Sequence, residues 1–259
     1  MYYLKLLLVV LLIWLIVAYL WIKNKIKMEK LSALCLVMLA LGVNTLAQNK
    51  TTGKQFTESF LQDSCSFQTT GHNNYFILEP GYQLVLEGIE GKDKIKLVIT
   101  VLNETKKIGN VETRIVEENE SANGKTVEIS RNYFAFCKQT GSVFYFGEAV
   151  DMYKNGNIVN HDGAWIAEGK NKAGIMMPGI VLLGARFYNE IAPGVALDRV
   201  EIISITDTLQ TPAGTFLNCL KTEETTPLEP KAKEYKLFTP GIGLIKDGDL
   251  LLTKYGFIK

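Results

Sequence analysis

The sequence predicts a mainly β protein, a curved antiparallel meander sheet or half-barrel with little helix and an apolar N-terminal segment. Three observations predict it. First, apolar runs from residue 75 onward are separated by tight-turn dipeptides, among them Pro80-Gly81, Asn123-Gly124 and Asn155-Gly156. Second, almost no stretch there repeats apolar residues at the spacing of a helix. Third, the first 47 residues differ in kind, because two apolar runs dominate them.

The N-terminal region combines a long apolar run with a short one. Residues 4–22 are almost unbroken Leu, Val, Ile, Trp and Tyr, about the length that crosses a bilayer. The basic stretch 23–30 follows, and then a shorter apolar run at 31–43. A positive start, an apolar run and a small residue, Ala47, give the segment from Met28 the order of parts found in signal peptides.

Two interpretations of this region are open. In the first, translation begins at Met28, residues 1–27 are an over-extended start, and residues 28–47 are a signal peptide. In the second, both apolar runs form a membrane hairpin with the basic stretch on the cytoplasmic side. We favour the first because the second run is too short to span well. Both place residues 48–259 outside the cytoplasm, in the periplasm, the outer envelope or the medium, anchored only if residues 1–47 are retained.

Net charge limits the expected binding partners, and the number of cysteines limits the expected disulfides. Without its first 47 residues the chain is slightly acidic and has no basic stretch, so nucleic acid and anionic membrane surfaces are not expected partners. Cys65, Cys137 and Cys219 lie in this part, and an odd number leaves at least one thiol over. The simplest interpretation of each cysteine is a small, buried apolar side chain. A bridge between Cys137 and Cys219 stays open because both lie in strand-like segments.

The β elements follow in order. Residues 48–72 are polar without a clear period and are expected to be a tether, so one antiparallel β domain is expected over 73–259. Residues 163–196 are rich in Gly and Pro and are expected as an extended excursion. The expected strand-forming stretches are 75–88, 94–104, 110–120, 121–136, 139–148, 197–207, 211–224 and 233–256.

Several of these stretches carry a resemblance. "NYFILEPGYQLVLEG", "VFYFGEAVDMYKNG", "HDGAW", "TPAGTFLNCLKTEETTPLEP" and "TPGIGLIKDGDLLL" resemble a family of uncharacterised exported bacterial proteins, over about residues 73–256. The last two also resemble broader groups of β-rich envelope proteins with a half-barrel sheet. The resemblance implies export and a curved antiparallel sheet. It implies no activity or ligand, so no catalytic residue is carried over.

Common catalytic and metal motifs are absent from the sequence. It contains no GxSxG, P-loop, HExxH or EF-hand pattern. His72 and His161 are the only histidines, which excludes a site built from several histidines. No cofactor is therefore expected, apart from the calcium ion considered next.

The hairpin at Asn155-Gly156 holds the candidate catalytic and metal residues. A two-residue loop, the register we favour, places His161 beside Glu148 on one face, as a candidate catalytic pair. The opposite face then holds an oxygen-rich cluster that suits a hard cation such as calcium. The members of that cluster are Asp151, Asn160 and Asp162.

A three-residue loop with a bulge is the alternative. It places Asp151 diagonal to His161, as the start of a base and the group that orients it. A third interpretation is simpler than either. Carboxylates beside a hairpin usually form a solvated face, and a single histidine among apolar residues is usually structural.

The excursion supplies a candidate ligand cleft. An aromatic residue at the start of a long loop on a rigid sheet is a reasonable place to bind an apolar molecule. The same residues could instead fill the half-barrel as a plug, which we favour. They are Trp165, Met176, Met177, Phe187 and Tyr188.

These features give two hypotheses of function. The first is an exported binding or structural module of the cell envelope, with an apolar small molecule or another envelope protein as partner. The alternative is a hydrolase-type enzyme that uses His161 with Glu148 or Asp151, with or without the assistance of a metal ion. An open apolar trough inside the sheet would indicate a binder, and a packed interior a structural role.

Overall fold

The computed structural model describes residues 10–19 and 53–258 of the chain. Residues 10–19 are helical, and the chain divides into two compact units, Met1–Lys54 and Gln55–Lys259. The predicted signal peptide, 28–47, lies outside the described residues. Within the described ranges, no helix combines the length and the apolar character that crossing a bilayer requires.

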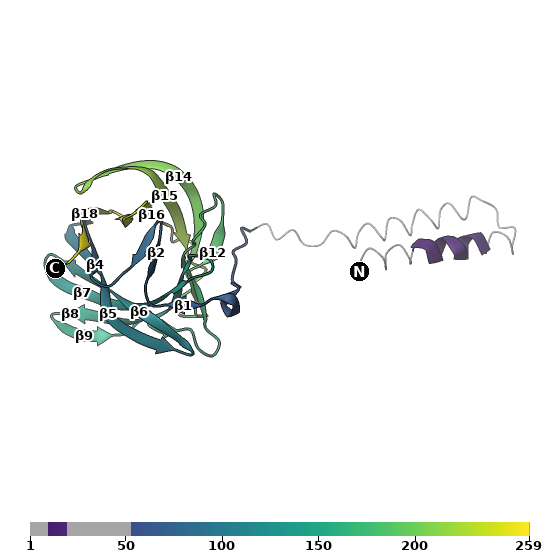
Figure 1. Cartoon of the computed structure of the whole chain (residues 1–259), viewed down its shortest axis with the longest axis horizontal. Helices are drawn as coiled ribbons and strands as arrows, with labels where there is room; N and C mark the ends of the chain where they lie inside the picture. Colours follow the sequence, from purple (N-terminus) through teal and green to yellow (C-terminus); the bar gives the residue numbers. More distant parts are fainter. Residues whose placement is uncertain (1–9, 20–52, 259) are drawn as a thin grey trace. The chain divides into compact units, whose positions relative to one another are not determined.

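The unit that begins at Gln55 is almost entirely antiparallel sheet, which confirms the predicted fold class (Figure 1). A short 3-10 helix, η1 (Gln62–Ser64), precedes the strands. The strands are β1 (Phe67–Gln68), β2 (Gly71–Asn73), β3 (Phe76–Leu78), β4 (Tyr82–Glu90), β5 (Asp93–Ile108), β6 (Val111–Ala122), β7 (Lys125–Cys137), β8 (Val143–Lys154), β9 (Asn157–Asn160), β10 (Trp165–Ile166), β11 (Lys172–Met177), β12 (Arg186–Tyr188), β13 (Glu190–Ile191), β14 (Arg199–Thr211), β15 (Gly214–Thr225), β16 (Glu234–Thr239), β17 (Gly243–Asp247) and β18 (Leu250–Phe257).

Two meanders make up the main sheet. Strands β4 to β8 pair in chain order, as do β14 to β18, and the last strand, β18, pairs with β4 to join the two. This 16-stranded sheet runs β12-β14-β15-β16-β17-β18-β4-β5-β6-β7-β8-β11-β13, with β1, β9 and β10 attached at its side. Hairpin turns explain the meander, because antiparallel neighbours need only short connections.

The two edges of the sheet come from consecutive pieces of chain. Edge strand β12 pairs with β14, whereas edge strand β13 pairs with β11, and only Asn189 separates β12 from β13. The sheet therefore curls until its edges nearly meet (Figure 1). Thr57 covers the β12 edge through a parallel bridge to Phe187.

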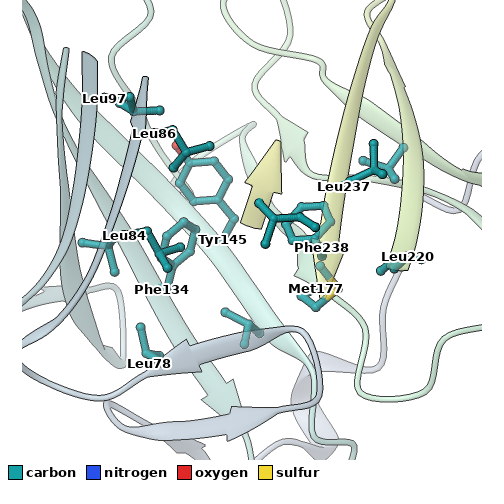
Figure 2. Packing of buried hydrophobic residues seen from close by; sticks show 14 of the residues in the cluster. Leu78, Leu84, Leu86, Leu97, Phe134, Tyr145, Met177, Leu220, Leu237 and Phe238 are labelled. Carbon is teal, nitrogen blue, oxygen red and sulfur yellow. The ribbon is translucent and has the colours of Figure 1, made fainter. Parts of the chain in front are cut away.

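The interior of this curled sheet is an apolar core. Leu84 and Leu86 on β4 face Phe238 on β16 across it, as Figure 2 shows. Leu86 is completely buried and Phe238 nearly so. Strand alternation sends Phe134 into this core and its neighbours Tyr133 and Ala135 to a second, smaller cluster on the other face.

Part of the segment expected as a polar tether, 48–72, covers that second cluster, since Phe60, Cys65 and Phe67 pack against it. Phe67 packs edge-on against Phe144 and Phe146, with ring centroids 5.3 and 5.2 Å apart. A disulfide ties Cys65 to Cys137. Isolated aromatic residues and one cysteine hold the segment in place. Because these residues form no repeating apolar pattern, the sequence did not predict this packing.

The third cysteine is separate from this bridge. Cys219 is buried and is not disulfide-bonded. A bridge between Cys137 and Cys219 is therefore not formed.

Candidate functional site

The hairpin at Asn155-Gly156 begins as a two-residue loop. Asn155 and Gly156 both have positive φ, at 54° and 80°, and Lys154 pairs with Asn157 and Tyr153 with Ile158 across them. The register then shifts, because Met152 pairs with Asn160 and leaves Val159 as an extra residue. Such a bulge moves every following residue by one place.

The bulge joins Asp151 to His161, a contact that the favoured register excluded. Nδ1 of His161 lies 3.0 Å from Oδ1 of Asp151 and 2.8 Å from the carbonyl oxygen of Val150. Since both neighbours accept hydrogen bonds, the neutral ring carries its proton on Nδ1 and keeps the Nε2 lone pair. The side chain of His161 is 65% exposed. A carboxylate that orients an exposed imidazole is half of a general-base arrangement.

Asp151 has a second partner. Its Oδ2 accepts from Nη1 of Arg131 at 3.1 Å, and Nε of Arg131 lies 3.1 Å from Oε2 of Glu117. A polar row therefore runs from Glu117 on β6 through Arg131 on β7 and Asp151 on β8 to His161. Arg131 compensates one of the two carboxylate charges in this row.

The predicted calcium ligands do not form one group. Both carboxylate oxygens of Asp151 face Arg131 or His161, and Oδ1 of Asn160 accepts from the backbone N–H of Asp162 at 3.2 Å. In residues 10–19 and 53–258, no three His, Cys, Asp or Glu side chains are placed to hold a metal ion together. Calcium binding here stays a proposal.

Glu148 belongs to a different group from His161. Alternation puts Glu148 and Asp151 on opposite faces of β8. Trp165 pairs with Glu148 in the β8–β10 register, and its indole Nε1 lies 3.4 Å from Oε1 of Glu190 on β13. Burial, with repulsion from Glu118, raises the pKa of Glu148 to about 7. Burial, with repulsion from Glu148, raises the pKa of Glu190 to about 8.

These two carboxylates belong to a larger set around one lysine, which we call the interior acidic group. Nζ of Lys236 on β16 lies 3.2 Å from Oε2 of Glu224 and 3.5 Å from Oδ2 of Asp247. Burial lowers the pKa of Lys236, but attraction to Asp247 and Glu224 outweighs it and leaves that pKa well above its usual value. Burial raises the pKa of Glu118 to about 7 although Lys236 opposes the shift. The members are Glu118, Glu148, Glu190, Glu224, Asp247 and Lys236.

Sequence reasoning missed this group because its members lie on six different strands. The one available signal was that Val116 and Glu118 share a face of β6. That alternation places a glutamate on the same face as a core residue, but it does not indicate which residues contact that glutamate.

Beside the interior acidic group lies a cavity of about 70 Å³. Glu118, Lys236 and Asp247 form its polar side, and Phe134, Met176 and Phe238 form part of its apolar side. That volume suits about two water molecules. Drug-sized ligands fill pockets of roughly 300–1,000 Å³, so this part of the interior is packed rather than open.

Most residues of the predicted cleft fill the core. Trp165, Met177 and Phe187 are 5%, 2% and 6% exposed and belong to the main core cluster. Met176 packs against that cluster, and Tyr188 lies edge-on to Phe56 at 6.1 Å. Most of these side chains therefore lie in the interior of the curled sheet, as the plug interpretation expects.

Comparison with protein-family models and with curated proteins found no match. Among solved structures the chain is similar to a crystal structure described as "a putative lipoprotein" from Parabacteroides distasonis. The match has a TM-score of 0.37 and 16% identity, and covers 72% of this chain and 100% of that one. It is too distant to support an argument about function. The family resemblance drawn from the sequence stays a prediction, whereas the structure itself shows the β-rich fold.

Proposed function

We propose that this protein is an exported module of the cell envelope that acts through its outer surface and does not carry a ligand inside its sheet. The packed interior is the observation that carries the proposal. The one cavity described above, about 70 Å³, is several times smaller than a typical ligand pocket.

Export has a separate support in the Cys65–Cys137 disulfide. Disulfides persist in oxidising compartments and are rare in the cytosol. The N-terminal sequence agrees, since both interpretations of residues 1–47 place the domain outside the cytoplasm.

Two measurements test the proposal. Alkylation of thiols in intact cells, followed by mass spectrometry, should find Cys65 and Cys137 protected as a disulfide. Titration of the purified full chain with the apolar dye N-phenylnaphthylamine should give no saturable uptake. Reduced Cys65 and Cys137 in cells would refute export. Stoichiometric dye uptake that a fatty acid displaces would refute the packed interior.

One observation favours the hydrolase alternative, namely the 3.0 Å contact between His161 and Asp151. Hydrolysis of p-nitrophenyl acetate, with and without calcium, tests it in four proteins. These are the wild type, His161→Ala, Asp151→Asn and His72→Ala. His72 is a matched control because its side chain is also exposed, at 72%. Activity that only the His161 and Asp151 variants lose would support the alternative, and equal background rates in all four would end it.

The calcium proposal is tested by thermal melting. A cation held by Asp151, Asn160 and Asp162 would raise the melting temperature of the wild type, because a ligand that binds the folded state stabilises it. Asp151→Asn would lose that increase. An unchanged wild-type melting temperature would end the proposal.

A further inference from the structure

An exposed aliphatic loop connects β11 to β12. Ile180, Leu182 and Leu183 are 76%, 63% and 64% exposed, and no charged residue occurs between Lys172 and Arg186. Consecutive exposed apolar residues are costly in a soluble protein and usually mark an interaction site. We call residues 179–184 the aliphatic loop.

The aliphatic loop is held firmly at its base. The N–H of Gly179 donates to Oγ of Ser142 at 3.1 Å, and a Cβ on Gly179 would lie 2.0 Å from the carbonyl oxygen of Thr140. At the other end the N–H of Gly184 donates to the carbonyl oxygen of Ile202 at 2.8 Å. The loop therefore projects from a fixed frame.

One residue of the loop points the other way. Val181 is partly buried and packs against the interior core. This inward contact fixes the orientation of the loop, and the side chains of Ile180, Leu182 and Leu183 are all exposed. The arrangement presents a small, preformed aliphatic tip.

The chemistry of the tip suits lipid better than protein. Energetically dominant residues in protein interfaces are mostly Trp, Tyr and Arg, with Leu and Val under-represented. The tip has neither an aromatic nor a charged side chain. Shallow insertion at the boundary between headgroups and acyl chains buries apolar side chains such as Leu and leaves the loop's backbone near water.

The position of the loop points to the same partner. The chain that precedes the domain enters beside it, because Thr57 bridges Phe187 and its N–H donates to the carbonyl oxygen of Arg186 at 3.0 Å. Leu183 is four residues from Phe187, at most roughly 14 Å along the chain. The preceding sequence contains the apolar runs 4–22 and 31–43. If residues 1–47 are retained, as in the second interpretation of that region, membrane attachment through them would bring this end of the domain to the bilayer.

We propose that the aliphatic loop is a membrane contact, in which Ile180, Leu182 and Leu183 enter the interfacial layer of a bilayer next to the point where the N-terminal sequence joins the domain. The inference rests on the proposed function in one respect, that the module lies at the envelope. A single aliphatic insertion gives weak, reversible binding, and stable attachment takes two signals. The loop would supply one of them and orient the domain on the surface.

The test compares two equally exposed leucines in the full chain. Leu182 is 63% exposed in the loop, and Leu217 on β15 is 62% exposed. Each is replaced by Cys in a Cys35→Ala background and labelled with the polarity-sensitive dye NBD. The disulfide and the burial of Cys219 leave the introduced thiol as the one that reacts under native conditions. Near-ultraviolet circular dichroism checks that both labelled proteins are folded.

Both proteins are bound to zwitterionic vesicles of phosphatidylcholine with or without brominated acyl chains. The label at 182 should shift to the blue and lose intensity to bromine, whereas the label at 217 should do neither. An equal response at both sites would overturn the proposal. So would a blue shift at 182 that needs no vesicles and grows with protein concentration, since a second copy would then cover the loop. Neither result depends on the thiol state in cells, so failure of the export proposal is seen separately.

Discussion

The indole Nε1 of Trp165 lies 3.4 Å from Oε1 of Glu190, and this contact links β10, which is attached to β8, with the edge strand β13. Both residues are buried, at 5% and 8% exposure. Tyr145 packs against the same indole with ring centroids 5.4 Å apart. The place where the sheet nearly closes is thus held by a polar contact inside an aromatic cluster.

Trp165→Phe should lower the free energy of unfolding by about 2 kcal/mol. It removes the indole N–H and leaves the buried Glu190 carboxyl without that donor, a loss in the range typical of unsatisfied buried groups. Urea denaturation measures the change. Trp14→Phe is the control, because Trp14 is 73% exposed in the other compact unit. Equal midpoints for the two variants would contradict the prediction.

Stability should fall as the pH rises from about 4.5 to about 8. Burial raises the pKa values of Glu118 and Glu148 to about 7 and of Glu190 to about 8, from an ordinary value of 4.5. A group whose pKa is higher in the folded state binds more protons there, so raising the pH through this window favours unfolding. Urea denaturation at pH 5, 6.5 and 8 follows the trend.

Glu190→Gln isolates one of these groups. Glutamine keeps Oε1 as the acceptor for Trp165 but cannot ionise, so the variant should be more stable than the wild type at pH 8, on the order of 3 kcal/mol, and similar at pH 5. Glu87→Gln, on an exposed carboxylate of β4, is the control. A wild type that gains stability between pH 5 and pH 8 would contradict the predicted pH dependence.

Loss of the disulfide should destabilise the domain by about 4 kcal/mol. Cys65 and Cys137 are 72 residues apart, and a bridge of that span restricts the unfolded chain by roughly this amount. The double variant Cys65→Ala/Cys137→Ala is compared with the wild type with and without reductant. Cys219→Ala is the control, since it keeps the bridge and should stay sensitive to reductant. Insensitivity of the wild type would refute a structural role for the bridge.

Gly174→Ala should cost about 3 kcal/mol, because the added methyl group overpacks the place where the sheet closes. A Cβ on Gly174 would lie 2.1 Å from the carbonyl oxygen of Asn189, between the two edge strands. Gly124→Ala is the comparison. Its φ is +79° with open space around it, so only backbone strain, about 1 kcal/mol, is expected. Thermal melting of the two variants checks the order.

The sequence predicted the meander because each hairpin carries its own local turn signal. Asn123 and Asn155 have the positive φ that a tight turn before glycine requires. The register beyond Asn155-Gly156 was not predictable in the same way. Ile158 and Val159 are both exposed, at 49% and 55%, so no buried face constrained the pairing and a bulge was free to form.

The interior acidic group and the disulfide were out of reach for a different reason. Glu118, Glu190 and Lys236 come together only after three distant strands have curled into one sheet. The pairing of Cys65 with Cys137 depends on where an irregular segment crosses β7. Neither relationship leaves a periodic pattern in a single sequence.

The single residue between β12 and β13 has a consequence for how copies of this protein behave toward one another. An exposed sheet edge is a template on which another chain can add a strand, the first step of aggregation. Here one edge strand has three residues and the other two, Asn189 joins them, and Thr57 already occupies a place on one of them. The closure at Asn189 therefore leaves little of these two edges free to accept a strand from another copy.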